Sequence, residues 1–464
     1  MPDFSIPFVT PGSASAAVPV TFVTAATWTQ ARERLDAKSR AFAAAAGFEP
    51  RAGRHLLLPG PDGGLSGVLF GLENADDAGK DLLRPGALPT LLPAGTYCFA
   101  NAPHDARLAA LAFALGAYRF ARYRKVEDKD IRLELPAGVD GAELTRIAEG
   151  VALARDLINT PANDMGPAEL ESAAHDLATR HRATFRAIVG ENLLSENFPL
   201  IHAVGRAADR APRLIDIGWG DPANAKITLI GKGVCFDTGG LDIKTESGML
   251  NMKKDMGGAA TVLALGHMLM DRGAKVRLRI LLPVVENAIS GSAFRPRDIY
   301  RSRKGVSVEI GNTDAEGRLI LADALALADE EAPELIVDMA TLTGAARVAL
   351  GPEVVPFYTD DDALAAELAR SAEAESDPLW RLPLWLPYDT MLDSKVADIN
   401  NVSAGGFAGS ITAALFLRRF VTAAKTWLHC DIYAWNQATK PGRPEGAECQ
   451  AARALYHLIT ARYG

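Results

Sequence analysis

The sequence predicts an α/β protein of two domains: a larger C-terminal domain with a mostly parallel sheet flanked by helices, and a smaller N-terminal α/β domain. A chain of 464 residues is longer than one ordinary hydrophobic core. After about residue 150, strand-like apolar runs alternate with helical patterns, which is typical of a sheet covered on both faces. Between Lys125 and Asp140 the sequence becomes charged and then reads LPAGVDG, so we place the domains at residues 1–140 and 141–464.

The N-terminal domain is expected to combine short strands with two helices. Apolar runs at Val18–Val23, Arg54–Leu58 and Val68–Phe70 predict strands. The Ala-rich stretch Trp28–Gly47 predicts an amphipathic helix, and the composition of His104–Tyr123 predicts another. No group of polar residues in this domain indicates a functional site.

The C-terminal domain begins with a long helix, Glu143–Leu157, and an ordered turn rich in Pro, Gly and Asn at Asn159–Pro167. Strands and helices then alternate. The expected strands are Leu214–Trp219, Ile227–Phe236, Val276–Val285, Val306–Ile310, Leu335–Met339 and Trp427–Ala434. The expected helices are Gly257–Met270, Gly317–Asp329, Asp361–Glu375, Ser410–Thr422 and Glu448–Ala461.

Composition excludes several classes of protein. With 48% hydrophobic and 23% charged residues the chain reads as a soluble globular protein. The net charge of −8 argues against a nucleic-acid partner, and no apolar run reaches the roughly 18 residues that span a membrane. The first basic residue is Arg32, so the N-terminus does not resemble a secretory signal. The four cysteines form no CxxC pair, and we expect a reducing cytoplasmic location.

Four acidic residues stand where strands end and helices begin. Asp237 ends an apolar strand, Asp255 precedes the helix at Gly257, and Asp314 and Glu316 flank the start of another helix. Parallel sheets bind ligands at the carboxyl ends of their strands. Carboxylates crowded there repel one another unless cations neutralise them, and hard oxygen ligands suit Mg, Mn or, less selectively, Zn. A solvated acidic edge is the alternative, and these residue types alone leave both interpretations open.

Three basic residues accompany the acids: Lys232 within GKG, Lys244 within LDIK, and Arg318 within EGRL. Glycine allows backbone and ligands to approach closely, which favours a site over an ordinary surface. A nucleotide-binding loop is disfavoured, because GKG has no Walker spacing and no GxGxxG opens a helix. The absence of HExxH also argues against a metzincin-type zinc site.

The motifs GKGVCFDTGG, LDIK, MKKDMGGAA, NTDAEGRL and DMATLTGA, together with RDLINTPANDMGP, resemble those of the leucyl aminopeptidase family. Members of this family are two-metal exopeptidases of the cytosol. The resemblance covers roughly residues 150–464, and the family's variable N-terminal α/β domain would occupy the preceding residues. The segment HCDIYAWNQATKPGRPEGAECQ departs from the commoner family ending and resembles a bacterial subgroup.

The resemblance implies two divalent metal ions per subunit, Mn, Zn or Mg. Asp237 and Glu316 would each bridge the two ions. Asp255 and the amine of Lys232 would complete the tighter site, and Asp314 would complete the looser one with its side chain and backbone carbonyl. Lys232 coordinates only as the neutral amine, and a neighbouring dication favours that form.

The resemblance also implies roles for residues around the metals. Lys244 would stabilise the developing gem-diolate oxygen, and Arg318 would hold a bicarbonate ion that acts as general base. Met252, Thr341 and Gly344 match positions that line the pocket for the first side chain of the peptide substrate. Their mostly apolar character favours Leu or Met.

The family further implies a homohexamer, with an assembly or regulatory role for the N-terminal domain. A second hypothesis is a non-catalytic DNA-binding or architectural role, since a fold does not determine a function. That role would be indicated by a lost ligand or by a basic N-terminal face. All seven polar positions are present, and the first 31 residues contain no Lys or Arg, so we favour catalysis.

Overall fold

The computed structural model describes residues 5–10, 12, 17–125 and 129–464. The chain folds into two compact units. The smaller contains Asp3–Ala152 and Gln437–Glu445, and the larger contains Leu153–Asn436 and Gly446–Gly464. Val126–Asp128, in the charged stretch near the expected boundary, lie outside the described residues. No helix in the described ranges is both long and apolar enough to cross a membrane.

The smaller unit is built on one six-stranded sheet with the order β1-β6-β5-β2-β4-β3, in which only the β3–β4 pair is antiparallel. Its strands are β1 (Phe8–Val9), β2 (Val18–Val23), β3 (His55–Pro59), β4 (Leu65–Gly71), β5 (Gly95–Phe99) and β6 (Ile131–Glu134). Its helices are α1 (Trp28–Arg34), α2 (Ala37–Ala45), η1 (Arg84–Ala87), α3 (Leu88–Leu91) and α4 (Ala106–Ala117). Helix α5 (Gly141–Asn159) begins in this unit.

The prediction of one helix over Trp28–Gly47 is wrong, because α1 and α2 are separate. The backbone is extended at Leu35 and Asp36, and the Asp36 side chain accepts hydrogen bonds from the backbone N–H groups of Lys38 and Ser39. An N-cap of this kind starts a new helix. The other predicted helix, His104–Tyr123, is shorter than expected; it begins after the N-cap Asp105 and ends at Ala117.

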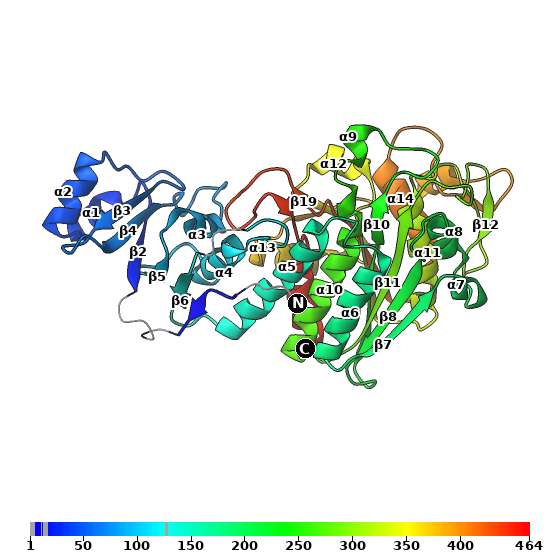
Figure 1. The fold of residues 1–464 in the computed structure, drawn as a ribbon, viewed down its shortest axis with the longest axis horizontal. Coiled ribbons are helices and arrows are strands. Elements are labelled where there is room, and N and C mark those ends of the chain that lie inside the picture. Colours follow the sequence, from blue (N-terminus) through cyan, green and yellow to red (C-terminus); the bar gives the residue numbers. More distant parts are fainter. Residues whose placement is uncertain (1–4, 11, 13–16, 126–128) are drawn as a thin grey trace. The chain divides into compact units, whose positions relative to one another are not determined.

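The larger unit contains a nine-stranded sheet with the order β16-β15-β18-β14-β9-β11-β8-β7, and β10 pairs with β11 off this path (Figure 1). The pairs among β11, β9, β14 and β18 are parallel, whereas β7, β8 and β15 add antiparallel pairs toward the edges. The fold class predicted from the sequence is confirmed. These strands are β7 (Thr184–Val189), β8 (Arg213–Trp219), β9 (Ala225–Gly231), β10 (Gly233–Asp237), β11 (Val276–Asn287), β14 (Leu335–Ala340), β15 (Val355–Tyr358), β16 (Leu379–Arg381) and β18 (Thr426–Asp431).

Helices cover both faces of this sheet, with α6 and α10 on one face and α8 and α11 on the other (Figure 1). The helices of this unit after α5 are α6 (Pro167–Arg180), α7 (Asn192–Ser195), α8 (Pro199–Gly205), α9 (Glu246–Met249), η2 (Met252–Met256), α10 (Gly257–Arg272), α11 (Glu316–Asp329), α12 (Gly344–Leu350), α13 (Asp362–Ala374), η3 (Leu386–Leu392), α14 (Gly409–Arg418) and α15 (Ala452–Tyr463).

Two predicted strands of this unit differ from the observed ones. The expected strand Ile227–Phe236 is interrupted at Lys232, which separates β9 from β10. The expected strand at Val306–Ile310 forms β13 (Ser307–Glu309), which belongs to a separate small sheet with β12 (Ile299–Arg301) and β17 (Ile399–Asn400). A further two-stranded pair joins β19 (Trp435–Asn436) to β20 (Gly446–Ala447). A short apolar run does not reveal which sheet it enters, because pairing depends on distant residues.

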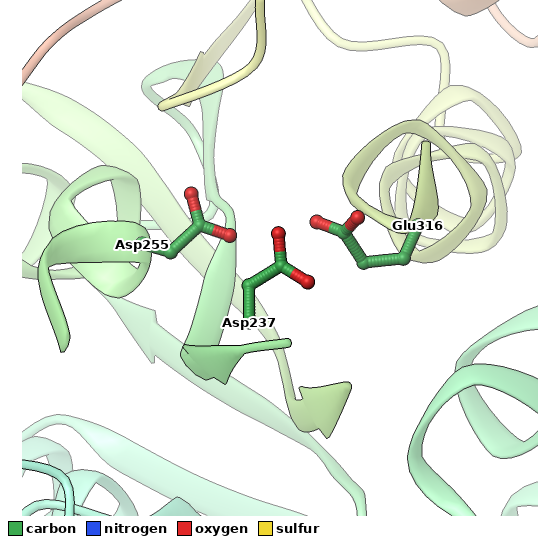
Figure 2. A group of neighbouring side chains, drawn as sticks. All are labelled: Asp237, Asp255 and Glu316. Atoms are coloured by element: carbon green, nitrogen blue, oxygen red, sulfur yellow. The ribbon is translucent and has the colours of Figure 1, made fainter. Parts of the chain in front are cut away.

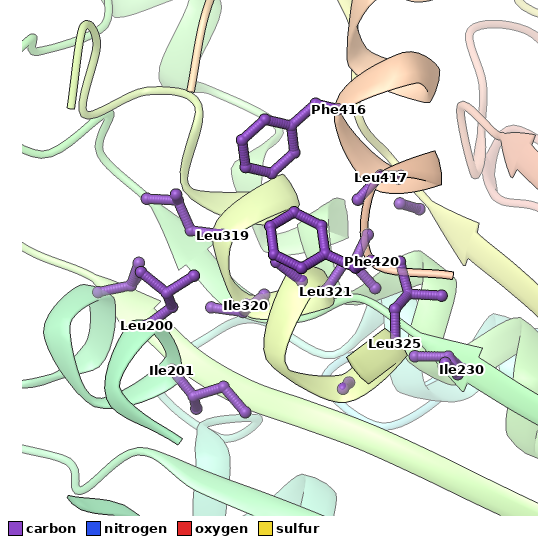
Figure 3. Close-up of a cluster of buried hydrophobic side chains, with 14 of the residues drawn as sticks. Leu200, Ile201, Ile230, Leu319, Ile320, Leu321, Leu325, Phe416, Leu417 and Phe420 are labelled. Carbon is purple, nitrogen blue, oxygen red and sulfur yellow. The ribbon is translucent and has the colours of Figure 1, made fainter. Parts of the chain in front are cut away.

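The core beneath the sheet fixes the start of α11. Leu319, Ile320, Leu321 and Leu325 of α11 pack with Phe416 and Leu417 of α14 and Phe420 just after it, with Leu200 and Ile201 of α8, and with Ile230 of β9 (Figure 3). All ten side chains are at most 1% exposed. A helix with apolar contacts on several sides cannot shift easily, so its first residue, Glu316, has a defined place beside the sheet.

Gly258, in the first turn of α10, packs against backbone. A Cβ at this position would overlap the carbonyl oxygen of Met339 and would lie 2.9 Å from the amide nitrogen of Lys232. The amide of Ala259 donates to the carbonyl of Lys232 at 2.9 Å. Helix α10 therefore begins in direct contact with β9 and β14, and this contact sets the place of Asp255 immediately before it.

We expect Gly258→Ala to lower the free energy of unfolding by about 3 kcal/mol, because backbone cannot move aside as a side chain can. Gly291→Ala is the control, since a Cβ there meets nothing within 4 Å; we expect it to change stability by less than about 0.5 kcal/mol. Urea unfolding of both variants checks this. Equal midpoints would contradict the close packing of α10.

Candidate metal centre

Four segments bring the predicted polar residues together. Asp237 is the last residue of β10, Asp255 lies in η2, and Glu316 is the first residue of α11. Their carboxylates point toward one another from these three elements (Figure 2). One carboxylate oxygen from each lies within 4.8 Å of the others, and all three residues are buried. Lys232, at the break between β9 and β10, completes the group.

The amine of Lys232 lies between two of these carboxylates. Its Nζ is 2.8 Å from Oδ2 of Asp255 and 2.8 Å from Oε1 of Glu316, and it donates to the carbonyl oxygen of Thr341 at 2.9 Å. Gly317 makes room for the amine, since a Cβ there would lie 2.7 Å from Nζ. The break in the predicted strand thus places the Lys232 side chain inside the carboxylate cluster.

Lys244 links the cluster to the fourth acid. Its Nζ lies 2.9 Å from Oδ2 of Asp237 and 2.5 Å from Oδ1 of Asp314. Asp314 is less enclosed than the other acids: its side chain is 32% exposed, against 3% for Asp237. The structure therefore brings Lys232, Asp237, Asp255 and Glu316 into a buried cluster and joins Asp314 at its open side through Lys244.

Crowded negative charge shifts the pKa values of these groups. Burial, followed by the charge of Asp237, raises the pKa of Glu316 to about 8 and that of Asp314 to about 6. Burial also raises the pKa of Asp255, against the opposing effect of Lys232. Burial alone would lower the pKa of Lys232, but Asp255, Glu316 and Asp237 outweigh it and raise this pKa. The cluster thus has an excess of buried negative charge that additional cations would stabilise.

Two of the carboxylates are oriented by hydrogen bonds from residues that the sequence did not single out as supports for metal ligands. Oδ1 of Asp237 accepts hydrogen bonds from Nδ2 of Asn287 at 2.9 Å and from the amide of Gly239 at 2.8 Å. Oδ1 of Asp255 accepts one from the hydroxyl of Thr341 at 2.7 Å. In both residues the second oxygen remains directed at a lysine. Asn287 pairs in register with Asp237. Its only signal in the sequence is that it is a polar residue at the end of the apolar strand β11.

The chemistry of this donor set fits a divalent metal ion. It consists of carboxylate oxygens and one amine, a set suited to Mg, Mn or Zn. Within the described ranges, Oε2 of Glu316 is buried and accepts no hydrogen bond. A buried acceptor without a donor is costly, and a cation would satisfy it.

Arg318 lies in the first turn of α11, two residues after Glu316, and is 7% exposed. Its Nη1 donates to the carbonyl oxygen of Asn401 at 2.7 Å, and burial lowers its pKa to about 10. Asn401 also accepts from the amides of Gly311 and Asn312, so it supports the loop that leads to Asp314. Sequence reasoning missed Asn401, because it is distant in the chain from the residues it supports.

The three predicted pocket residues lie in different surroundings. Met252 is the first residue of η2 and is half-buried, Thr341 is buried beside Asp255, and Gly344 is exposed at the start of α12. A Cβ on Gly344 would lie 3.6 Å from Nη2 of Arg347. The guanidinium of Arg347 lies over the ring of Tyr433, 4.9 Å from its centroid. The surroundings of Gly344 are therefore more polar than the mostly apolar pocket that the sequence predicts.

These features define an α/β protein with a buried site for divalent metal. The sequence model of the cytosol aminopeptidase family, catalytic domain, matches residues 152–456, and that of the M17 aminopeptidase N-terminal domain matches residues 18–136. The chain belongs to the cytosol aminopeptidase family. It is accordingly a metal-dependent aminopeptidase, a hydrolase of peptide bonds.

Individual relatives agree with this assignment. A probable cytosol aminopeptidase of Roseiflexus castenholzii is 42% identical over 363 residues, covering 74% of each chain. Peptidase B of Serratia proteamaculans is 41% identical over 338 residues, covering 71% of this chain and 78% of that protein. The crystal structure of a cytosol aminopeptidase from Coxiella burnetii superposes with a TM-score of 0.93 at 44% identity, covering 98% of this chain and 99% of the other. The bottromycin maturation enzyme BotP in complex with Mn gives a TM-score of 0.86 at 33% identity, covering 97% and 100%.

We expect Thr341→Val to weaken metal binding about 10- to 100-fold, because it preserves side-chain size but removes the donor that orients Asp255. Thr341→Ser retains the hydroxyl and should retain most of the affinity. Competition with a graded series of chelators, followed by metal analysis of the protein, measures the effect. The same affinity in the Val variant as in the parent would show that Asp255 does not need this hydrogen bond.

Proposed function

We propose that this aminopeptidase releases N-terminal amino acids from peptides with two divalent ions, Mn, Zn or Mg. Asp237 and Glu316 would be the ligands shared by the two ions, Asp255 and Lys232 would hold the ion of the tighter site, and Asp314 would hold that of the looser one. The observation that carries the proposal is that three buried carboxylates, each with one oxygen within 4.8 Å of the others, lie beside the buried amine of Lys232. The exposure of Asp314 supports its assignment to the exchangeable site.

Bound in this set, the ions supply Lewis acidity and a water with hydroxide character near neutral pH. Lys244 contributes a positive charge beside them. Burial opposes that charge, but Asp237 and Asp314 outweigh burial and raise the pKa of Lys244. The ammonium therefore stays charged and stabilises negative charge that develops on the scissile carbonyl oxygen. Two short ion pairs hold it in place before the substrate arrives.

In this proposal Arg318 would hold a bicarbonate ion, which would supply a general base. Its buried guanidinium is fixed through Nη1 to the backbone of Asn401, while its Nε donates to no group in the described part of the chain. A guanidinium with a free donor is suited to a planar oxyanion. Met252, Thr341 and Gly344 form the pocket for the first side chain, and the thioether and threonine methyl favour a leucine-like residue.

We extend the proposal to assembly and location. The catalytic domain comprises residues 141–464, and residues 1–140 form a family-variable domain with an assembly or regulatory role in a homohexamer. A cytoplasmic location is supported by relatives named as cytosol aminopeptidases. The alternative, a non-catalytic DNA-binding or architectural role, is not favoured, because all seven polar residues are retained.

Activity should require divalent metal. Dialysis against a chelator should abolish hydrolysis of leucine p-nitroanilide, because the proposed reaction relies on the ions to lower the pKa of the attacking water and to polarise the scissile carbonyl. Mn, Co, Zn or Mg added back should restore it. Full activity in a sample shown by metal analysis to be metal-free would refute the proposed function.

Glu316→Ala and Lys244→Ala should impair the enzyme in different ways. Glu316→Ala removes a ligand shared by both ions, so metal content and rate should fall together. Lys244→Ala should lower kcat by about two to four orders of magnitude, as expected for loss of a preorganised oxyanion donor, while both ions remain bound. Metal analysis beside steady-state kinetics separates the two. Loss of metal from the Lys244 variant would mean that the roles of Lys232 and Lys244 are exchanged.

A further inference from the structure

Two loops carry the groups on the open side of the metal centre. The first, Thr238–Lys244, follows β10 and ends at Lys244, which is proposed to stabilise the developing oxyanion. The second, Gly311–Ala315, precedes α11 and carries Asp314. The ion pair between Lys244 and Asp314, at 2.5 Å, joins the far ends of these loops. A lysine side chain has four flexible carbon–carbon bonds, so this geometry depends on how firmly the two loops are held together.

A reciprocal pair of residues, Asp242 and Thr313, ties the loops. Oδ2 of Asp242 accepts a hydrogen bond from the amide of Thr313 at 2.8 Å and lies 3.2 Å from the hydroxyl oxygen of Thr313. The amide of Asp242 donates to Oγ1 of Thr313 at 2.8 Å. The same hydroxyl lies 2.6 Å from the carbonyl oxygen of Gly239, to which it donates. We call these contacts the Asp242–Thr313 clasp.

The clasp acts on a loop that is folded back on itself. The amide of Lys244 donates to the carbonyl of Thr238 at 3.0 Å. Gly239 has a φ of +86°, and a Cβ there would lie 2.6 Å from the carbonyl oxygen of Asp242 and 3.0 Å from the amide of Lys244. Contacts within the first loop therefore fix the backbone conformation near Lys244. Asp242 then fixes the position of the second loop relative to this backbone.

We propose that Asp242 is a positioning residue for the aminopeptidase reaction: through Thr313 it fixes the Lys244 ammonium relative to the carboxylates of Asp237 and Asp314. This inference rests on the proposed role of Lys244. Among the described residues, Asp242 forms no hydrogen bond with a proposed metal ligand, and it is exposed, so it acts through the loops. A donor to a developing oxyanion stabilises it only when held in place beforehand, and a displacement of about 1 Å can cost on the order of a hundredfold in rate.

The chain contains a second clasp of the same chemistry, which serves as a matched control. Oδ2 of Asp398 accepts from the amide and the hydroxyl of Ser307, both at 2.7 Å, and the amide of Asp398 donates to Oγ of Ser307 at 2.9 Å. Asp398 is exposed, as Asp242 is. This clasp joins β13 to the residue before β17, and in the described part of the chain its hydrogen bonds reach no proposed ligand.

The experiment compares Asp242→Ala, Asp242→Asn and Asp398→Ala by steady-state hydrolysis of leucine p-nitroanilide at saturating Mn. We expect Asp242→Ala to lower kcat about 10- to 100-fold, with KM within about threefold and both ions bound. Asp242→Asn keeps an acceptor oxygen and should recover most of the rate. Asp398→Ala should leave kcat within about twofold. An equal effect of the two Ala variants would show that loss of any such clasp suffices, and would overturn the inference.

A second arm repeats Asp242→Ala in the Lys244→Ala background. If Asp242 acts through Lys244, its removal there should lower kcat by no more than about threefold, because the group it positions is gone. The same 10- to 100-fold loss in both backgrounds would overturn the inference. If Lys244→Ala alone leaves kcat unchanged, the proposed function of Lys244 fails; if it lowers kcat but Asp242→Ala does not, only the positioning role fails.

Discussion

Burial of like charge is the constraint on which the rest of this structure depends. Three carboxylates that converge within 4.8 Å, with a fourth beside them, would separate if the backbone allowed it. They are kept together because each comes from an element fixed by other contacts: β10 in the sheet, η2 before the closely packed α10, and the core-facing α11. Thr341 and Asn287 then hold one oxygen each of Asp255 and Asp237, and two lysines face the oxygens that remain.

Much of this arrangement could be predicted from the sequence, because its signals are local. The apolar runs of β8, β11 and β14 and the apolar stripes of α10 and α11 are periodic over enough residues to be identified without a structure. Asp237, Asp255 and Glu316 could be singled out because each stands where such an element ends or begins among glycines. Their convergence follows from a general property of parallel sheets, whose strand ends meet at one edge.

The remaining features depend on residues far apart in the chain. Nothing near Asn287 indicates that it pairs with Asp237, and nothing near Asn401 indicates that it supports the loop before Asp314. The break at Lys232 was hidden by apolar residues on both sides, which continue the pattern of one strand. Similarly, the apolar periodicity of Trp28–Gly47 obscured the cap at Asp36. In each case a specific polar contact, which periodicity does not report, determines the local geometry.

The glycines around the metal centre have a consequence for directed evolution of selectivity. At Gly258 and Gly317 an added methyl group would meet backbone or the Lys232 amine, so a library that varies these positions would consist mainly of defective proteins. At Gly344 the same methyl group would make an ordinary contact, 3.6 Å from the flexible end of Arg347. In the proposed substrate pocket, saturation of Gly344 and Met252 would therefore test new side-chain preferences while the residues of the carboxylate cluster stay unchanged.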